Sequence, residues 1–235
     1  MNMGDSVEQL LSGLQTGFID KSVISNAEYL PEILTNDLKR KRKVLTTIHR
    51  ELSECDEFWI SVAFLTMSGF ASLVNKLLEL QDRNTKGKIL VSQYLNFTQP
   101  EALKKLSKFT NIELKIINTD NFHSKGYLFK KGQYYSLIIG SSNLTAGALS
   151  TNQELNLKVK AHADSKIIQS FFDEFQSSYN KAIGVTNEYL NDYTKIYNNK
   201  IITENNIRET VKPDSEKLFS PNKMQSEALI RMKEL

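Results

Sequence analysis

The 235-residue sequence has little cysteine and no long apolar segment. Cys55 is its only cysteine, which excludes an intramolecular disulfide and is typical of a cytoplasmic protein. The longest apolar run, Phe58 to Leu65, is far too short to span a membrane. The first residues also lack the cationic start and apolar stretch of an export signal. We therefore expect a cytoplasmic protein without a membrane partner.

An excess of charge of one sign is also absent. Lysine and arginine total 30 against 27 acidic residues, so the net charge is only +3 and any affinity for nucleic acid must come from local clustering. We expect the densest cluster on a helix that begins after Asn36 and runs to about Glu54. A grip on DNA phosphates is one interpretation, and a solvated helix face is the other. This basic run is Lys39, Arg40, Lys41, Arg42 and Lys43.

Strand-like and helix-like patterns alternate through the middle of the chain. A strand-like run at 58–65 precedes a helical pattern that starts near Ser68, and the same order repeats before a strand at 112–117. We therefore predict an α/β fold with a mixed, largely parallel β-sheet flanked by helices on both faces. Composition changes after residue 180, so we expect a main domain at 1–183 and a helical tail at 184–235.

Polar residues border three strand-like runs between residues 121 and 157. His123 and Lys125 precede Tyr127, and because they are two apart we expect them on one face of a strand. An imidazole would then lie beside a permanent cation. The next strand ends at Gly140, and a third run starts near a carboxylate that could fix the imidazole tautomer. The other polar groups at these strand ends are Ser141, Asn143 and Glu154. Together they predict a phosphoryl-transfer site that needs no metal and no cofactor.

The pattern His123-x-Lys125, Gly140-Ser141-x-Asn143 and Glu154 resembles the signature of the phospholipase D superfamily, especially its nuclease members. The resemblance implies that His123 attacks phosphorus to form a phosphohistidine, and that a second histidine protonates the leaving oxygen. It also implies that Glu154 orients His123. The implied ligands of the phosphate oxygens are Lys125, Ser141 and Asn143. One position departs from the family pattern, since Lys130 replaces the usual aspartate five residues after the lysine. Several nuclease-type relatives also lack this aspartate.

The second histidine is missing from this chain. His49 and His162 have no matching lysine or Gly-Ser-x-Asn context, so neither substitutes for it. We therefore expect a two-fold homodimer that brings two copies of His123 into one composite site acting on DNA.

Residues 220–229 resemble the glutamine-containing segment that leads into the ATPase core of DEAD/DEAH-box helicases. A Gly-x-x-x-x-Gly-Lys-Ser/Thr phosphate loop does not occur in the sequence. The chain is thus similar to an amino-terminal nuclease domain of a helicase fusion, with the helicase domain expected carboxy-terminal to it. An ordinary terminal helix is the alternative interpretation of this segment.

Three other functions compete with a metal-independent nuclease. A lipid phosphodiesterase or phosphatidyl transferase would use the same chemistry, but we find no interfacial amphipathic helix. A non-catalytic module could dimerise a helicase and hold DNA through a retained phosphate site. A metal-dependent nuclease is least favoured, because one carboxylate and one imidazole are too few ligands for a hard divalent cation.

Overall fold

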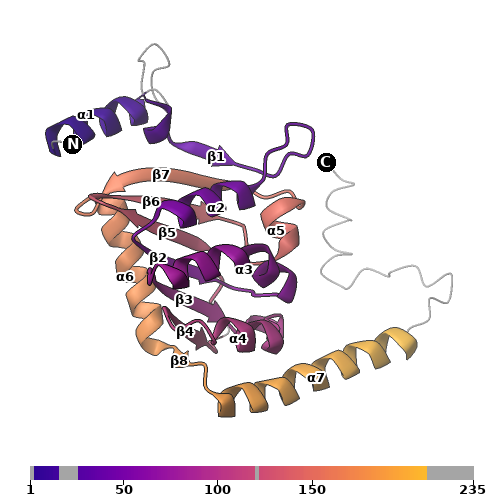
Figure 1. Cartoon of the computed structure of the whole chain (residues 1–235). Helices are drawn as coiled ribbons and strands as arrows, with labels where there is room; N and C mark the ends of the chain where they lie inside the picture. The colour runs from indigo at the N-terminus through magenta and orange to yellow at the C-terminus, as the bar shows by residue number, and fades with distance from the viewer. Residues whose placement is uncertain (1–2, 16–25, 120–121, 211–235) are drawn as a thin grey trace, which may run out of the picture. The chain divides into compact units, whose positions relative to one another are not determined.

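The computed structural model describes residues 3–15, 26–119 and 122–210. Within these residues, eight strands form one sheet in the order β1-β7-β6-β5-β2-β3-β4-β8 (Figure 1). The strands are β1 (Glu32–Leu34), β2 (Glu57–Val62), β3 (Lys86–Ser92), β4 (Ile112–Ile117), β5 (Gly126–Lys131), β6 (Tyr134–Gly140), β7 (Asn156–His162) and β8 (Ile183–Gly184). The α-helices are α1 (Met3–Leu14), α2 (Val44–Glu54), α3 (Met67–Asp82), α4 (Pro100–Leu106), α5 (Ala146–Ser150), α6 (Lys166–Lys181) and α7 (Asn187–Thr210), and the short 3₁₀ helices are η2 (Ala27–Tyr29) and η3 (Tyr94–Asn96).

The predicted mixed sheet is confirmed, but its parallel part is smaller than expected. Only the pairs β2–β3 and β3–β4 run parallel among the described strands, and every other pair is antiparallel. The helices α3 and α4 return the chain from β2 to β3 and from β3 to β4 in the same direction, whereas the short helix α5 lies between β6 and β7, which pair antiparallel. A tight turn at Gly132, whose φ is +59°, then joins β5 directly to β6. The expectation of a largely parallel sheet is therefore wrong.

Helices cover both faces of the sheet, as predicted. On one face α3 contacts α2, α4 and α5, and α6 lies on the other face (Figure 1). Strand β2 lies between these two layers of helices. Its successive side chains point to opposite faces of the sheet, so they pack against both layers. Phe58 and Ile60 are completely buried, whereas the ring of Trp59 meets Phe172 of α6 with 5.0 Å between the ring centroids. This double cover explains the nearly continuous apolar sequence of β2.

The basic run does not lie on a helix, which corrects the prediction. Helix α2 begins at Val44, and the preceding residues form a turn closed by a bridge between Asp37 and Arg42. Asn36 still caps the helix, because its side-chain oxygen accepts a hydrogen bond from the Val44 N–H at 2.9 Å. It does so across the turn instead of from the adjacent position. Leu38, at an apolar position of the expected helix, is 67% exposed, so the helical spacing at this point is fortuitous.

The chain divides into two compact units between Lys195 and Ile196. In the first unit, β8 pairs with β4, and the Tyr193 hydroxyl of α7 donates a hydrogen bond to the Thr98 carbonyl at 2.7 Å. Residues just beyond the predicted boundary at 183 therefore pack on the sheet. No helix in the part of the chain that the structure describes is long and apolar enough to cross a membrane.

Candidate functional site

Three strand ends meet at one edge of the sheet. The first residue of β5, Gly126, pairs with Ile139 near the end of β6. The last residue of β6, Gly140, pairs with Asn156, the first residue of β7. The Gly140 N–H also donates to the Lys125 carbonyl at 3.3 Å. The polar residues that precede β5, follow β6 and precede β7 therefore come together, as the sequence predicts.

His123 and Lys125 are in direct contact. The Lys125 ammonium lies 2.6 Å from Nδ1 and 2.8 Å from Nε2 of His123, and it donates to the His123 carbonyl at 2.8 Å. Because β5 begins at Gly126, the two side chains meet in the segment before the strand and not on one strand face. Lys125 is buried, with 9% of its surface exposed, whereas His123 is exposed. A substrate can thus reach the imidazole while the cation lies behind it.

The pKa values of both side chains are lowered. Desolvation lowers the pKa of His123, and the positive charge of Lys125 lowers it further. Burial also lowers the pKa of Lys125, while the charge of Glu154 opposes that effect. A neutral imidazole has a free nitrogen lone pair, which a nucleophile requires.

Ser141 and Glu154 form a pair of their own. The Ser141 hydroxyl donates a hydrogen bond to the Glu154 carboxylate and accepts one from the Leu155 N–H at 3.0 Å. Among the residues that the structure describes, Glu154 makes no hydrogen bond to the His123 ring. The expected carboxylate–imidazole pair is therefore absent within one chain. Lys125 is instead the group in contact with the imidazole nitrogens.

Asn143 connects the turn after β6 to the chain after β2. Its side-chain oxygen accepts a hydrogen bond from the Phe64 N–H at 3.0 Å, and the Leu144 N–H donates to the Phe64 carbonyl at 3.2 Å. The Asn143 Nδ2 group has no hydrogen-bond partner among the described residues. It remains available as a donor to a bound anion.

Sequence reasoning missed Asn156, which holds the turn in place. This residue is 1% exposed, its Oδ1 accepts from the Ser142 N–H at 3.2 Å, and its Nδ2 donates to Ser142 Oγ at 2.9 Å. The close approach of the strands here also requires Gly140, since a Cβ atom there would lie 2.3 Å from the Leu155 carbonyl oxygen. The sequence did offer one indication of this role. Asn156 stands between Leu155 and Leu157 in a strand-like run, and asparagine is uncommon in strands.

The basic run is anchored beside this edge. The last residue of β1, Leu34, pairs with Asn156, so β1 ends where β7 begins. The Asn36 amide then donates to the carbonyls of Ala148 and Asn152 at 2.8 and 2.9 Å, which fixes the start of the loop against α5 and the residues after it. All five basic residues of the run are exposed, and Arg40 forms an ion pair of 3.6 Å with Asp37.

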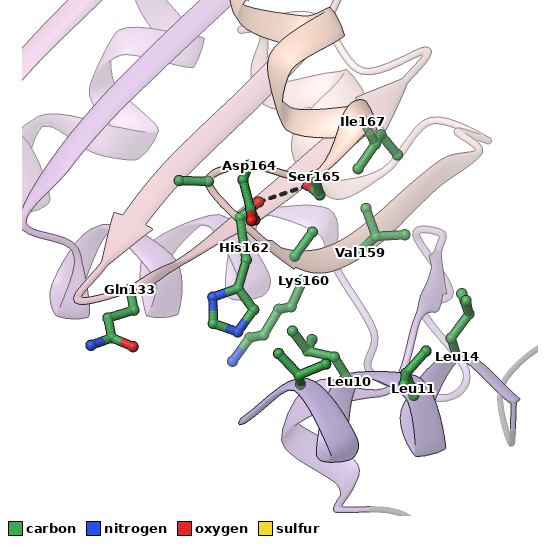
Figure 2. Close-up of a pocket in the computed structure, with 13 residues that line it drawn as sticks. Leu10, Leu11, Leu14, Gln133, Val159, Lys160, His162, Asp164, Ser165 and Ile167 are labelled. Atoms are coloured by element: carbon green, nitrogen blue, oxygen red, sulfur yellow. Dashed lines mark hydrogen bonds between the residues drawn. The ribbon is translucent and has the colours of Figure 1, made fainter. Parts of the chain in front are cut away.

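The other two histidines lie elsewhere. His162 ends β7, so its strand position lies about 20 Å from that of Asn156 at roughly 3.3 Å per residue. It faces a separate cavity of about 790 Å³ between α1 and the end of β7 (Figure 2). Its Nε2 lies 3.0 Å from Ser6 Oγ. His49 Nε2 lies 2.7 Å from the Ser72 carbonyl oxygen, between α2 and α3. Neither residue complements His123 within one chain.

The described residues contain no cluster of three or more histidine, cysteine, aspartate or glutamate side chains that could hold a metal ion. A comparison with family sequence models matches residues 48–179 to the family described as cardiolipin synthase, PLD-like domain. This range is more than half of the chain and includes His123, Lys125 and the turn after β6. The chain belongs to this PLD-like family. None of the curated proteins compared with it matches significantly.

Solved structures show the same fold. NucT from Helicobacter pylori superposes with a TM-score of 0.52 and 16% identity, covering 66% of this chain and 98% of NucT. Nuc from Salmonella typhimurium, a phospholipase D family member, gives the same TM-score, identity and coverage values. The mixed sheet with helices on both faces is thus a PLD-like fold.

Within this PLD-like chain, Lys130 makes a structural contact. It stands opposite Glu57 on the paired strands β5 and β2, and its ammonium donates to the Glu57 carboxylate at 3.2 Å. This contact raises the pKa of Lys130. Lys130 lies on β5 beyond the site edge, so the residue that replaces the usual aspartate joins two strands and does not contact His123.

Proposed function

We propose that this PLD-like protein is a metal-independent phosphodiesterase that cleaves DNA through a phosphohistidine on His123. The observation that carries the proposal is the contact between the exposed His123 imidazole and the buried Lys125 ammonium. The lowered pKa of His123 favours a nucleophilic imidazole, and the neighbouring cation attracts the phosphate.

In the first step, a nitrogen of neutral His123 forms a bond to phosphorus and the bond to the leaving oxygen breaks. A second, protonated histidine gives its proton to that oxygen. Lys125, Ser141 and Asn143 stabilise the charge on the non-bridging oxygens. In the second step, water attacks phosphorus, its proton passes to the second histidine, and His123 is released. Glu154 orients the Ser141 hydroxyl and favours the charged form of Lys125.

We propose that the second histidine is His123 of another copy of the chain. His49 and His162 bond to other elements, and each lies outside the motif. An isologous dimer with its two-fold axis near His123 would supply both histidines to one phosphate. Each copy would then provide the nucleophile for one reaction and the acid for the other.

DNA as the substrate is supported by the basic run beside the site edge. Lys39, Lys41, Arg42 and Lys43 are exposed and have no ion-pair partner among the described residues. Such side chains bind phosphates and release counterions. The proposed helicase partner rests on residues 220–229, which lie outside the described residues, and it stays a prediction, as does the cytoplasmic location.

Trapping of the covalent intermediate tests this mechanism. DNA labelled at the scissile phosphate should leave its label on the quenched protein, and the bond should be labile in acid but stable in alkali, as expected for a phosphohistidine. The label should be lost in His123→Ala and retained in His162→Ala. Label on His123→Ala would contradict the assignment, and a protein that sediments as a monomer while active would contradict the shared site.

A further inference from the structure

A small pocket of about 290 Å³ opens beside His123 on the α6 face of the sheet. Its volume is at the lower end of the roughly 300–1,000 Å³ of small-molecule sites, which suits one ring system better than an extended chain. The side chains important for recognition are three aromatic rings, two hydroxyls and one carboxylate. They are Phe122, Phe171, Phe175, Ser124, Ser178 and Glu174.

The aromatic wall of the pocket is held rigidly. Phe122 and Phe171 are half-buried and pack on a core cluster that includes Phe175. Phe171 and Phe175 are nearly parallel, with 6.1 Å between their centroids and 23° between their planes. The Phe171 ring also covers Gly126, where a Cβ atom would lie 2.6 Å from the ring. Fixed rings next to an imidazole form a platform on which a flat base can stack.

Glu174 gives the pocket a polar preference. Its side chain is exposed and makes no hydrogen bond or ion pair among the residues that the structure describes. A carboxylate repels phosphate, so this side of the pocket does not suit the DNA backbone. It accepts hydrogen bonds from exocyclic amino groups, which cytosine and adenine carry and thymine lacks.

We propose that this pocket binds an unpaired nucleobase next to the scissile phosphate, and that Glu174 selects bases with an exocyclic amino group. The inference rests on the proposed function, because His123 forms one wall of the pocket. A base in a duplex cannot enter the pocket while it stays stacked and paired. The preferred substrate is therefore a single strand, or a duplex with an unpaired nucleotide at the cleavage position.

Cleavage of short single-stranded oligo(dC), oligo(dA) and oligo(dT) of equal length tests the selection. The parent should show kcat/KM at least about fivefold higher for oligo(dC) and oligo(dA) than for oligo(dT), since one good base contact discriminates by that factor or more. Glu174→Ala should remove the preference for oligo(dC) and oligo(dA) over oligo(dT). Asp173→Ala is the matched control, because Asp173 is the adjacent exposed acid of α6 and does not line the pocket. Equal rates on all three substrates in the parent would overturn the selection by Glu174.

Binding separates failure of this inference from failure of the proposed function. If the parent cleaves none of the oligonucleotides, the nuclease assignment is contradicted, and fluorescein-labelled d(CCC) and d(TTT) then test the pocket by anisotropy. Tighter binding of d(CCC) that Glu174→Ala abolishes and Asp173→Ala retains would support the base site. Equal affinities of the parent for the two trinucleotides would overturn it.

Discussion

The side-chain oxygen of Asn143 accepts a hydrogen bond from the backbone N–H of Phe64 at 3.0 Å. This contact joins the turn after β6 to the chain that leaves β2, across 79 positions of sequence. It gives the two ends of one amide different roles. The oxygen stabilises the edge of the sheet, and the Nδ2 group is left to bind phosphate.

Two substitutions of Asn143 should separate these roles. Asn143→Asp keeps the acceptor for the Phe64 N–H, so the melting temperature should stay close to that of the parent. It removes the amide donor and adds a negative charge, and kcat should fall by about 10²–10³-fold, as for the loss of one preorganised donor. Asn143→Ala should also destabilise the fold by roughly 0.5–1.5 kcal/mol, because the hydrogen bond from the Phe64 N–H to the side-chain oxygen is lost. Full activity of Asn143→Asp would contradict the assigned role of Nδ2.

The His123 imidazole should titrate below the ordinary value for histidine. Desolvation and the charge of Lys125 both disfavour the imidazolium form. Because the proposed reaction needs one neutral and one protonated copy of His123, kcat/KM should show a bell-shaped pH dependence, and activity should fall as pH drops through the lowered pKa of the nucleophilic copy. NMR titration of the His123 ring should give a higher pKa in Lys125→Met than in the parent. An unchanged or lower value in that variant would show that the ammonium does not act on the imidazole.

The basic run should govern the salt dependence of DNA binding. Lys39→Gln combined with Lys43→Gln should weaken binding to all sequences alike, and should reduce the slope of log K against log salt by about 1 for each phosphate that the protein no longer neutralises. Lys166→Gln combined with Lys181→Gln is the control, because it removes the same charge from the exposed ends of α6. Fluorescence anisotropy over a salt series measures both slopes. The same slope in the two double variants would mean that the run is only a solvated turn.

The sequence predicted the parts of the fold that local patterns determine. The apolar strand β2 and the strand β6 that ends at Gly140 were expected and are present. The turn with Ser141 and Asn143 also lies beside His123 and Lys125, because strand pairing brings their flanking residues to one edge. A periodic apolar pattern combined with glycine at a strand end was sufficient for these features.

Other features depend on contacts between distant residues and could not be read from local patterns. The start of α2 at Val44 depends on Asn36, whose side chain also bonds to Ala148 and Asn152 more than a hundred positions away. The pairing of Glu154 with Ser141 instead of His123 depends on side-chain packing at the edge. The antiparallel pairing of β5 with β6 follows from the short connection at Gly132, which an apolar periodicity does not predict.

Cleavage of single- and double-stranded DNA in EDTA tests the central claim most directly. The parent, His123→Ala and the control His162→Ala should be compared at matched protein concentration, with circular dichroism to show that each is folded. The account predicts that the parent and His162→Ala cleave DNA in EDTA and that His123→Ala does not. Cleavage that disappears with EDTA and returns with a divalent cation, or cleavage that persists in His123→Ala, would contradict a metal-independent reaction through His123.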